Sequence, residues 1–331
     1  MALAIHLPAA YSTLCPEGLL EAIRGVYPVG KLVSCELWRP GPNDTYILTG
    51  CGGRYMLRAY GARRRSASHV RYELDLIDHL AAQGLPVCRP IPGQDGALTR
   101  AVPAPEGPRQ VALLTFPEGG PFVWSEGDHS YLAGKALARI HAASADFASR
   151  NPRFTLDLPY LIDAPLAALE PFLAHRPEDW GFLKALAGRL EAAAARVTAS
   201  GLDWGVCHGD FSDGCLQVDQ GAALTVFDFD PCGPGWRAYE LAAAQWSWIY
   251  HKKGALWDSF LKGYNEIRRL AAADLDALPL FHMISRLWRL GMDAVNADQW
   301  GAARLRDSNL DYHLQVFREW EAEHRSLIDG R

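Results

Sequence analysis

The sequence predicts an α+β fold in two parts, a strand-rich part followed by a mostly helical one. The chain has 331 residues, which is long for a single ordinary domain. Residues 32–60 alternate short β-like runs with turns rich in Gly and Pro, whereas the chain beyond residue 236 carries helical patterns. Between these regions lie two short apolar runs, and each of them ends in acidic residues. The β-like and helical patterns indicate the fold class. The apolar runs with acidic ends indicate where the chemistry lies.

The first part is expected to contain antiparallel strands and one main helix. Residues 66–83 have a helical period, because Val70, Leu74, Ile77 and Leu80 fall on one face, and Gly84-Leu-Pro86 ends this helix. The strands are expected at residues 32–39, 45–49, 54–60, 97–102 and 110–115, with turns at 40–44 and 51–53. This order, β-β-β-α-β-β, predicts a small lobe over residues 1–116.

The second part is expected to begin at the linker-like segment Pro117-Glu-Gly-Gly-Pro121. Helices are expected at residues 131–143, 164–175 and 178–199. Further helices are expected from Trp236 onward, interrupted at Gly254, Pro279 and Gly301. The apolar runs with acidic ends occupy residues 204–230. The second lobe is therefore predicted over residues 117–331.

Composition argues against several classes of partner. The net charge of −5 and the pI of about 6.1 give no electrostatic case for nucleic acid or an anionic membrane. The longest near-apolar stretch, Leu241 to Tyr250, is too short to span a bilayer. The seven cysteines are odd in number and include no Cys-x-x-Cys pair, which indicates reduced thiols and a cytoplasmic location. We expect no nucleic-acid or membrane partner, and the sequence leaves the oligomeric state open.

The two acidic segments form the most specific motif in the chain. Residues 208–215 read His-Gly-Asp-x-x-x-x-Cys, close to the kinase catalytic loop His-x-Asp-x-x-x-x-Asn. Phosphoryl transfer on such a scaffold needs one carboxylate to accept the proton of the attacking hydroxyl and another to hold magnesium. Asp210 and Asp228 are the candidates. The alternative is that Asp210 and Asp228 are loop residues that only cap turns. Such a role is easier to accept for one of the two aspartates than for both.

These segments resemble the aminoglycoside phosphotransferase / choline kinase superfamily, in the branch of generic phosphotransferases near homoserine kinase type II and the stress-response Ser/Thr kinase. The resemblance covers nearly the whole chain, and its parts are the phosphate-loop hairpin at Pro40–Tyr46, the strand Tyr55–Tyr60, the catalytic loop Val206–Leu216, the metal segment Phe227–Leu241 and the C-terminal helices from Asn296 to Glu323. It implies a bilobal protein-kinase-like fold with a small antiparallel-sheet lobe and a larger, mostly helical lobe.

The resemblance also implies roles for the residues around the two aspartates. Asp210 would be the catalytic base, His208 would support its loop, and Asp228 would be a ligand of Mg²⁺. Phosphate is then transferred from ATP to a hydroxyl of a small-molecule acceptor. Cys215 stands where the family has a metal-binding Asn, and a soft thiol cannot replace that ligand on magnesium. Asp213 or Asp230 is expected to take over the metal; without either, the site is impaired.

For the nucleotide, the resemblance implies contacts from the first lobe. Asn43 and Thr45 belong to the hairpin expected near the phosphates. Arg58 stands where the family has a basic residue on the α- and β-phosphates, and Glu73 on the following helix would orient it, since an Arg–carboxylate pair is rigid. A surface charge at a strand edge is the alternative for Arg58. The adenine would meet the backbone near Thr115 to Glu118, where Phe116 or Glu118 must supply the donor because Pro117 has no N–H.

Three functions remain open from the sequence. The first is a small-molecule O-phosphotransferase, the second a protein Ser/Thr kinase, and the third a catalytically impaired nucleotide-binding protein, which Cys215 makes credible. Acidic residues that could recognise a cationic acceptor are Glu240, Asp293 and Asp298. His141 is expected to be a buried structural histidine. Zinc-ligand types occur at Cys207, His208, Cys215 and Cys232, but their spacing fits no standard zinc pattern.

Overall fold

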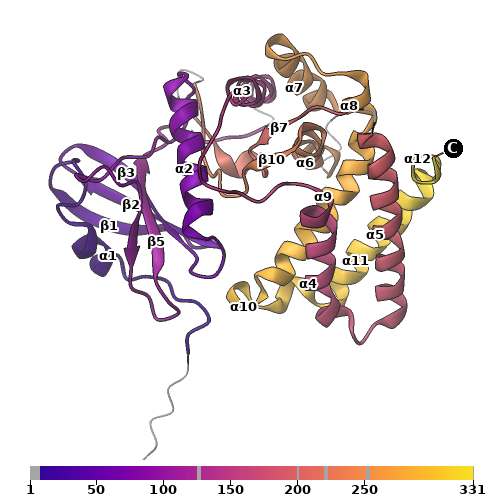
Figure 1. Ribbon diagram of the computed structural model, residues 1–331, viewed down its shortest axis with the longest axis horizontal. Helices are drawn as coiled ribbons and strands as arrows, with labels where there is room; N and C mark the ends of the chain where they lie inside the picture. The colour runs from indigo at the N-terminus through magenta and orange to yellow at the C-terminus, as the bar shows by residue number, and fades with distance from the viewer. Residues whose placement is uncertain (1–7, 125–127, 200, 220–222, 251–253, 331) are drawn as a thin grey trace, which may run out of the picture. The chain divides into compact units, whose positions relative to one another are not determined.

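A computed structural model describes residues 8–124, 128–199, 201–219, 223–250 and 254–330 (Figure 1). The chain divides into two compact units. Unit 1 comprises Met1–Glu118 together with Ala148–Arg153, and unit 2 comprises Gly119–Phe147 together with Phe154–Arg331. The sequence predicted two contiguous lobes, and the return of Ala148–Arg153 to unit 1 was not foreseen. No helix in the described part of the chain combines the length and apolar character that a membrane crossing requires.

Unit 1 is built on a five-stranded antiparallel sheet with the order β1-β2-β3-β5-β4. The strands are β1 (Leu32–Arg39), β2 (Asn43–Gly50), β3 (Gly53–Tyr60), β4 (Arg100–Val102) and β5 (Arg109–Thr115). The predicted strands at 32–39, 54–60 and 110–115 are confirmed to within one residue. The turn predicted at 40–44 is too long, because Asn43 and Asp44 already pair with Tyr60 and Ala59 across β2 and β3.

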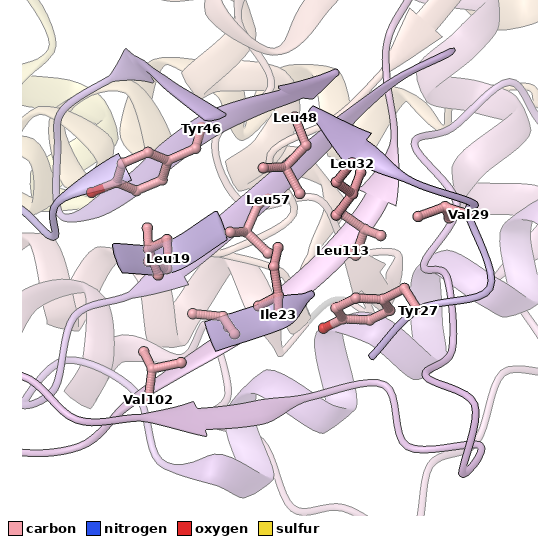
Figure 2. Close-up of a cluster of buried hydrophobic side chains, with 12 residues drawn as sticks. Leu19, Ile23, Tyr27, Val29, Leu32, Tyr46, Leu48, Leu57, Val102 and Leu113 are labelled. Carbon is pink, nitrogen blue, oxygen red and sulfur yellow. The ribbon is translucent and has the colours of Figure 1, made fainter. Parts of the chain in front are cut away.

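One face of this sheet carries the apolar core of unit 1. Helix α1 (Pro16–Ile23) lays Leu19 and Ile23 against Leu57 of β3 and Leu113 of β5, as Figure 2 shows. The sequence prediction missed this helix. Its signals were present, since Pro16 stands at the first helical turn and the two apolar residues are four positions apart.

The other face carries α2 (Ala67–Ala82), predicted as residues 66–83. Ser66 caps the helix, because its hydroxyl accepts a hydrogen bond from the His69 N–H at 3.2 Å. The segment Ala148–Arg153 is fastened to α2. The Asp75 carboxylate accepts bonds from the Ser149 hydroxyl at 2.7 Å and the Asn151 amide at 2.8 Å.

Unit 2 is mostly helical, with two small sheets. The longer helices are α3 (His129–Ala143), α4 (Ala164–Leu173), α5 (Pro177–Thr198), α6 (Arg237–Tyr250), α7 (Gly254–Ile267), α9 (Leu278–Val295) and α11 (Asp307–Glu323). Shorter ones are a π-helical turn (Pro159–Asp163), α8 (Ala272–Asp276), α10 (Ala297–Trp300), α12 (Arg325–Asp329) and 3₁₀ turns at Asp213–Cys215 and Ala302–Leu305. The sheets pair β7 (Trp204–Cys207) with β10 (Gly233–Trp236), and β6 (Gly120–Pro121) with β8 (Leu216–Val218) and β9 (Leu224–Val226). The predicted interruptions at Gly254, Pro279 and Gly301 fall at helix boundaries.

Two glycines allow α3 and α7 to pack closely. A Cβ atom on Gly134 would lie 2.0 Å from the carbonyl oxygen of Phe260, and one on Gly263 would lie 2.0 Å from that of Tyr131. Both distances are far below van der Waals contact, so only glycine fits at either position. This crossing fixes His141, near the end of α3, against Tyr264 of α7.

Candidate active site

The loop after β7 brings His208, Gly209 and Asp210 into a sharp turn. Gly209 has a φ of +91°, which favours glycine, and a Cβ atom there would lie 2.3 Å from the carbonyl oxygen of Pro231. The loop is therefore pressed against the segment that follows Asp228. A glycine between a histidine and an aspartate is required by this close approach as well as by the backbone angle.

Glu240 of α6 anchors this loop through two backbone bonds. Its Oε2 atom accepts the His208 N–H at 3.0 Å, and its Oε1 atom accepts the Gly209 N–H at 2.6 Å. The side chain is fully buried. The suggestion that Glu240 recognises a cationic acceptor is therefore wrong, because both oxygens are already engaged inside the protein.

His208 connects the loop to the strand that leads to Asp228. Its Nε2 lies 3.0 Å from the Phe227 carbonyl oxygen, and its Nδ1 lies 3.4 Å from the Asp210 backbone nitrogen. A neutral imidazole with its proton on Nε2 satisfies both contacts, since Nε2–H then donates and Nδ1 accepts. The ring is buried, so it holds two backbone segments together from within.

His141 and Tyr264 extend the anchor into α3 and α7. The His141 Nε2 lies 2.7 Å from Glu240 Oε2, and its Nδ1 lies 2.7 Å from the Tyr264 hydroxyl. Burial lowers the pKa of His141, which keeps the ring neutral. Burial opposes the charge on Glu240, but hydrogen bonds from His141 and Gly209 lower the pKa of Glu240 below its usual value. The expectation that His141 is a buried structural histidine is confirmed.

Asp210 is half-exposed and forms an ion pair with Arg289 of α9. The Arg289 Nη2 lies 2.6 Å from Asp210 Oδ1, and the side chains are 38% and 37% exposed. Asp210 raises the pKa of Arg289. The two residues are separated by 79 positions in the chain, and nothing in the sequence motif predicted the pair.

Asp228 follows β9 and Phe227, and its side chain is exposed. Its φ is +67°, and it is the one non-glycine with a positive φ among the residues that the structure describes. Asp tolerates this conformation better than most residues, and such sparsely populated angles gather at functional sites. Two positions on, Asp230 is buried instead. The paired acids of the motif therefore occupy different environments.

Cys215 has a structural place in the 3₁₀ turn that begins at Asp213. Its Sγ donates to the Ser212 carbonyl oxygen at 2.9 Å and accepts from the Ser212 N–H at 3.3 Å. Burial raises the pKa of the Cys215 thiol, so the sulfur stays protonated. A buried thiol engaged with backbone is a poor metal ligand, as the sequence argument required. Asp213, in contrast, is exposed.

Among the described residues, one group of three possible metal ligands lies close together: His141, Cys207 and Glu240, with ligand atoms within 4.8 Å of one another. The hydrogen bonds of His141 and Glu240 already occupy it, and burial raises the pKa of the Cys207 thiol. Asp213, Asp228 and Asp230 form no such group in the described chain. Mg²⁺ is usually held by one or two carboxylates together with substrate phosphates and water, so a magnesium site does not require such a group.

In unit 1, β3 and α2 bring Arg58 and Glu73 together. The Arg58 Nη1 lies 3.6 Å from Glu73 Oε1, and the side chains are only 8% and 1% exposed. The Tyr60 hydroxyl donates to the same Glu73 oxygen at 3.2 Å. The alternative of a surface charge at a strand edge is therefore wrong for Arg58, because β3 lies inside the sheet and the side chain is buried under α2.

Asn43 and Thr45 lie in β2 and not in a loop. Thr45 stands opposite Arg58 across β2 and β3. Asn43 is buried, and its side-chain oxygen accepts the Gly61 N–H at 3.1 Å. The phosphate-loop expectation for Asn43 needs this correction, since the hairpin turn is shorter than predicted and the Asn43 side chain braces the far end of β3.

Phe116 and Glu118 follow β5, and both contact Arg54 of β3. The Arg54 guanidinium lies 4.2 Å from the Phe116 ring centroid, and its Nη2 lies 2.6 Å from Glu118 Oε2. The Arg54 and Glu118 side chains are 48% and 65% exposed, so this ion pair contributes little to stability. The ion pair and the ring contact join β3 to the segment expected to meet the adenine.

Comparison with known proteins decides the family. The APH phosphotransferase enzyme family matches residues 41–274, which include both acidic segments and the Arg58–Glu73 pair. The chain belongs to the phosphotransferase enzyme family. It is a kinase-type phosphotransferase with a kinase-like α+β fold.

Relatives of this phosphotransferase match over most of their length. An uncharacterized protein of Deinococcus radiodurans is 36% identical over 328 residues, covering 96% of this chain and 93% of that protein. A homoserine kinase of Chelativorans sp. (strain BNC1) is 30% identical over 298 residues, covering 82% of this chain and 83% of that enzyme. Among solved structures, a microcompartment-associated aminopropanol kinase has the same fold, with a TM-score of 0.77 at 23% identity over 94% of this chain and 98% of that one.

Sequence reasoning missed Arg289 and misread Glu240 in this phosphotransferase. Arg289 stands between apolar residues in Leu287-Trp-Arg-Leu290, and this position could have been singled out. Asp293 and Asp298 were suggested as sites for a cationic acceptor. Asp293 pairs with Arg304 at 3.2 Å, and Asp298 is exposed on α10.

Proposed function

We propose that this phosphotransferase moves the γ-phosphoryl group of ATP to a hydroxyl of a small molecule, with Asp210 as the base and Asp228 as a ligand of Mg²⁺. The observation that carries the proposal is the anchored loop. Glu240 fixes the backbone at His208 and Gly209, and His208 ties the loop to Phe227, next to Asp228. Two carboxylates are thereby held on braced backbone with their side chains accessible, which suits chemistry that depends on positioning.

In this proposal each group has one task. Asp210 receives the proton of the acceptor hydroxyl while the oxygen forms a bond to the γ-phosphorus and the bond to ADP breaks. Mg²⁺, when bound, neutralises the charge on the phosphates. Asp228 holds it with a hard oxygen ligand, and the exposed Asp213 or the buried Asp230 is the candidate for a second protein oxygen.

The nucleotide is assigned to residues of unit 1. Arg58, locked by Glu73, would contact the α- and β-phosphates, with Thr45 opposite it on the next strand. Asn43 would act indirectly, because its side chain holds the backbone at Gly61 and would not contact the nucleotide itself. The backbone of Phe116 or Glu118 would donate to the adenine. These residues are the ones assigned to the nucleotide, and ATP is taken as the donor from the family resemblance.

The decisive experiment measures ADP formation with ATP, Mg²⁺ and a panel of small hydroxylated compounds. The names of the relatives suggest which compounds to test first, namely hydroxy amino acids and amino alcohols. We expect Asp210→Asn to lower kcat by about 100-fold or more while the affinity for nucleotide is kept, because the proton is taken only in the transition state. Asp228→Ala should remove metal-dependent nucleotide binding.

The control is Asp258→Asn, which changes an exposed aspartate of α7 in the same unit. It should leave turnover, nucleotide affinity and the metal requirement unchanged. The assignment of Asp210 fails if Asp210→Asn keeps most of its activity. The assignment of Asp228 fails if its alanine variant shows an unaltered metal requirement.

A further inference from the structure

We propose that the acceptor carries a carboxylate group and that Arg289 binds it beside the base. This inference rests on the proposed function, since it takes Asp210 as the base, and it narrows the acceptor to small hydroxy acids and hydroxy amino acids. The observation that motivates it is the 2.6 Å ion pair between Arg289 and Asp210.

The position of Arg289 is unusual for a structural arginine. It lies on α9 among Leu287, Trp288 and Leu290, all of which are buried. The base of the side chain is enclosed by the helix bundle, while 38% of the side chain remains exposed. The guanidinium thus lies next to Asp210 on a side chain whose base is enclosed, and a surface ion pair would not need this placement.

Asp210 alone does not satisfy this guanidinium. Only Nη2 bonds to the carboxylate, and Nε is buried without a hydrogen-bond partner among the described residues. A guanidinium offers a planar fork of N–H donors that matches a carboxylate in two parallel bonds. A carboxylate on the acceptor would add a charge-assisted bond on the exposed side of this guanidinium, next to the bond that Asp210 accepts.

The positive charge of Arg289 also favours one kind of acceptor. An acceptor with only an ammonium group near its hydroxyl would meet the positive charge of Arg289 when it approached Asp210. An acceptor with a carboxylate would be attracted to it. In the reaction the hydroxyl oxygen bonds to the γ-phosphorus, the proton passes to Asp210, and ADP leaves. Arg289 orients the acceptor through a group that does not react.

Three matched pairs of compounds isolate the carboxylate. Homoserine and 3-aminopropan-1-ol, threonine and 1-aminopropan-2-ol, and serine and ethanolamine differ within each pair only by this group. We expect the wild-type enzyme to show the higher kcat/KM for the acid in the pair that it uses. Arg289→Gln should lower kcat/KM for the acid by about 10- to 100-fold, mainly through KM, because one charge-assisted contact is lost.

The pattern across variants distinguishes this role from others. Because Arg289 also pairs with the base, Arg289→Gln is expected to lower kcat/KM for the acid by a larger factor than for its decarboxylated partner, and Arg289→Lys should restore part of the activity with the acid. Arg318→Gln, which changes an exposed arginine of α11 paired with Asp179, should have no effect on either compound. A structural role for Arg289 would lower both members of a pair equally.

Two results would overturn the inference. The first is a wild-type preference for the amino alcohol over its acid. The second is an equal loss for both members in Arg289→Gln, which would place the guanidinium on Asp210 or on the transferred phosphate. Calorimetry of the same pairs, in the presence of Mg²⁺ and a non-hydrolysable ATP analogue, reports binding without turnover. If no acid binds better than its decarboxylated partner in calorimetry, the inference is wrong. The Asp210 and Asp228 variants test the proposed function separately.

Discussion

At the scale of single residues, Cys215 stands where the resemblance implies a metal-binding Asn. Its thiol is bonded to Ser212 and stays protonated, so it brings no hard oxygen to a metal. An Asn in its place has an amide N–H that can donate to the Ser212 carbonyl and an oxygen that can bind Mg²⁺. We expect Cys215→Asn to lower the Mg²⁺ concentration for half-maximal rate several-fold, measured at saturating ATP.

Cys215→Ser is the matched control for that prediction. Its hydroxyl keeps a donor toward Ser212 without the reach of the amide, so the Mg²⁺ requirement should stay close to that of the wild type. If Cys215→Asn changes nothing and Asp213→Ala raises the Mg²⁺ requirement, then Asp213 already serves as the second protein oxygen.

Site residues could be singled out from the sequence only where a local motif contains them, and the roles assigned to them are predictions. Asp210, Asp228 and the poor ligand Cys215 stand in short segments that can be recognised on their own. Arg289 could not be paired with Asp210, because their contact depends on how α9 packs in the helix bundle. Glu240 was misread for a related reason: one acidic residue on a helix looks the same in sequence whether it faces solvent or two backbone N–H groups.

At the scale of elements, the crossing of α3 and α7 depends on glycine. A methyl group at Gly263 would lie 2.0 Å from the Tyr131 carbonyl oxygen, so the helices would have to separate. Overpacking of this kind costs about 1–3 kcal/mol or more. We expect Gly263→Ala to lower the free energy of unfolding by at least that amount in urea denaturation, and to lower kcat as well, because His141 on α3 supports Glu240.

Gly188→Ala provides the comparison within the same unit. Gly188 lies on the exposed side of α5, and a methyl group there would meet nothing within 4 Å. This change should stabilise the protein by about 0.5–1 kcal/mol, since alanine is the better helix former. A Gly263→Ala protein as stable as Gly188→Ala would contradict the packing argument.

Strands and helices were predicted well where turn-forming residues mark their ends, and less well elsewhere. Gly and Pro clusters located β1, β3, β5 and the interruptions before α7 and α9. Asn43 and Asp44 were assigned to a turn because of their residue type, but β2 begins at Asn43, where Asp44 forms a fully buried ion pair with Arg109 at 3.1 Å. Tertiary contacts outweighed local turn propensity there.

At the scale of the whole molecule, buried histidines should make stability depend on pH. Burial lowers the pKa of His141, and it lowers the pKa of His282 and His313 to about 4. The folded protein keeps these rings neutral, whereas the unfolded chain binds protons below a pH of about 6.5. The free energy of unfolding should therefore fall as the pH is lowered from about 6.5 toward 4, by up to about 1.4 kcal/mol per pH unit for each such group.

Urea denaturation between pH 7 and pH 5.5 measures this slope in a range where ordinary carboxylates do not titrate. His282→Gln should reduce the slope, because one of the proton-binding groups of the unfolded chain is gone. A stability that is flat over this range, or a slope that His282→Gln leaves unaltered, would contradict the prediction.

Because Ala148–Arg153 belongs to unit 1, a recombination point between residue 118 and this segment would separate two parts of the same unit. A coding fragment that stopped after residue 118 would encode the sheet and α2 but not Ser149 and Asn151, the donors that bond to Asp75. An exchange between related genes at that point would combine an α2 from one parent with a fastening segment from the other. Recombination that preserves this contact must carry both stretches together.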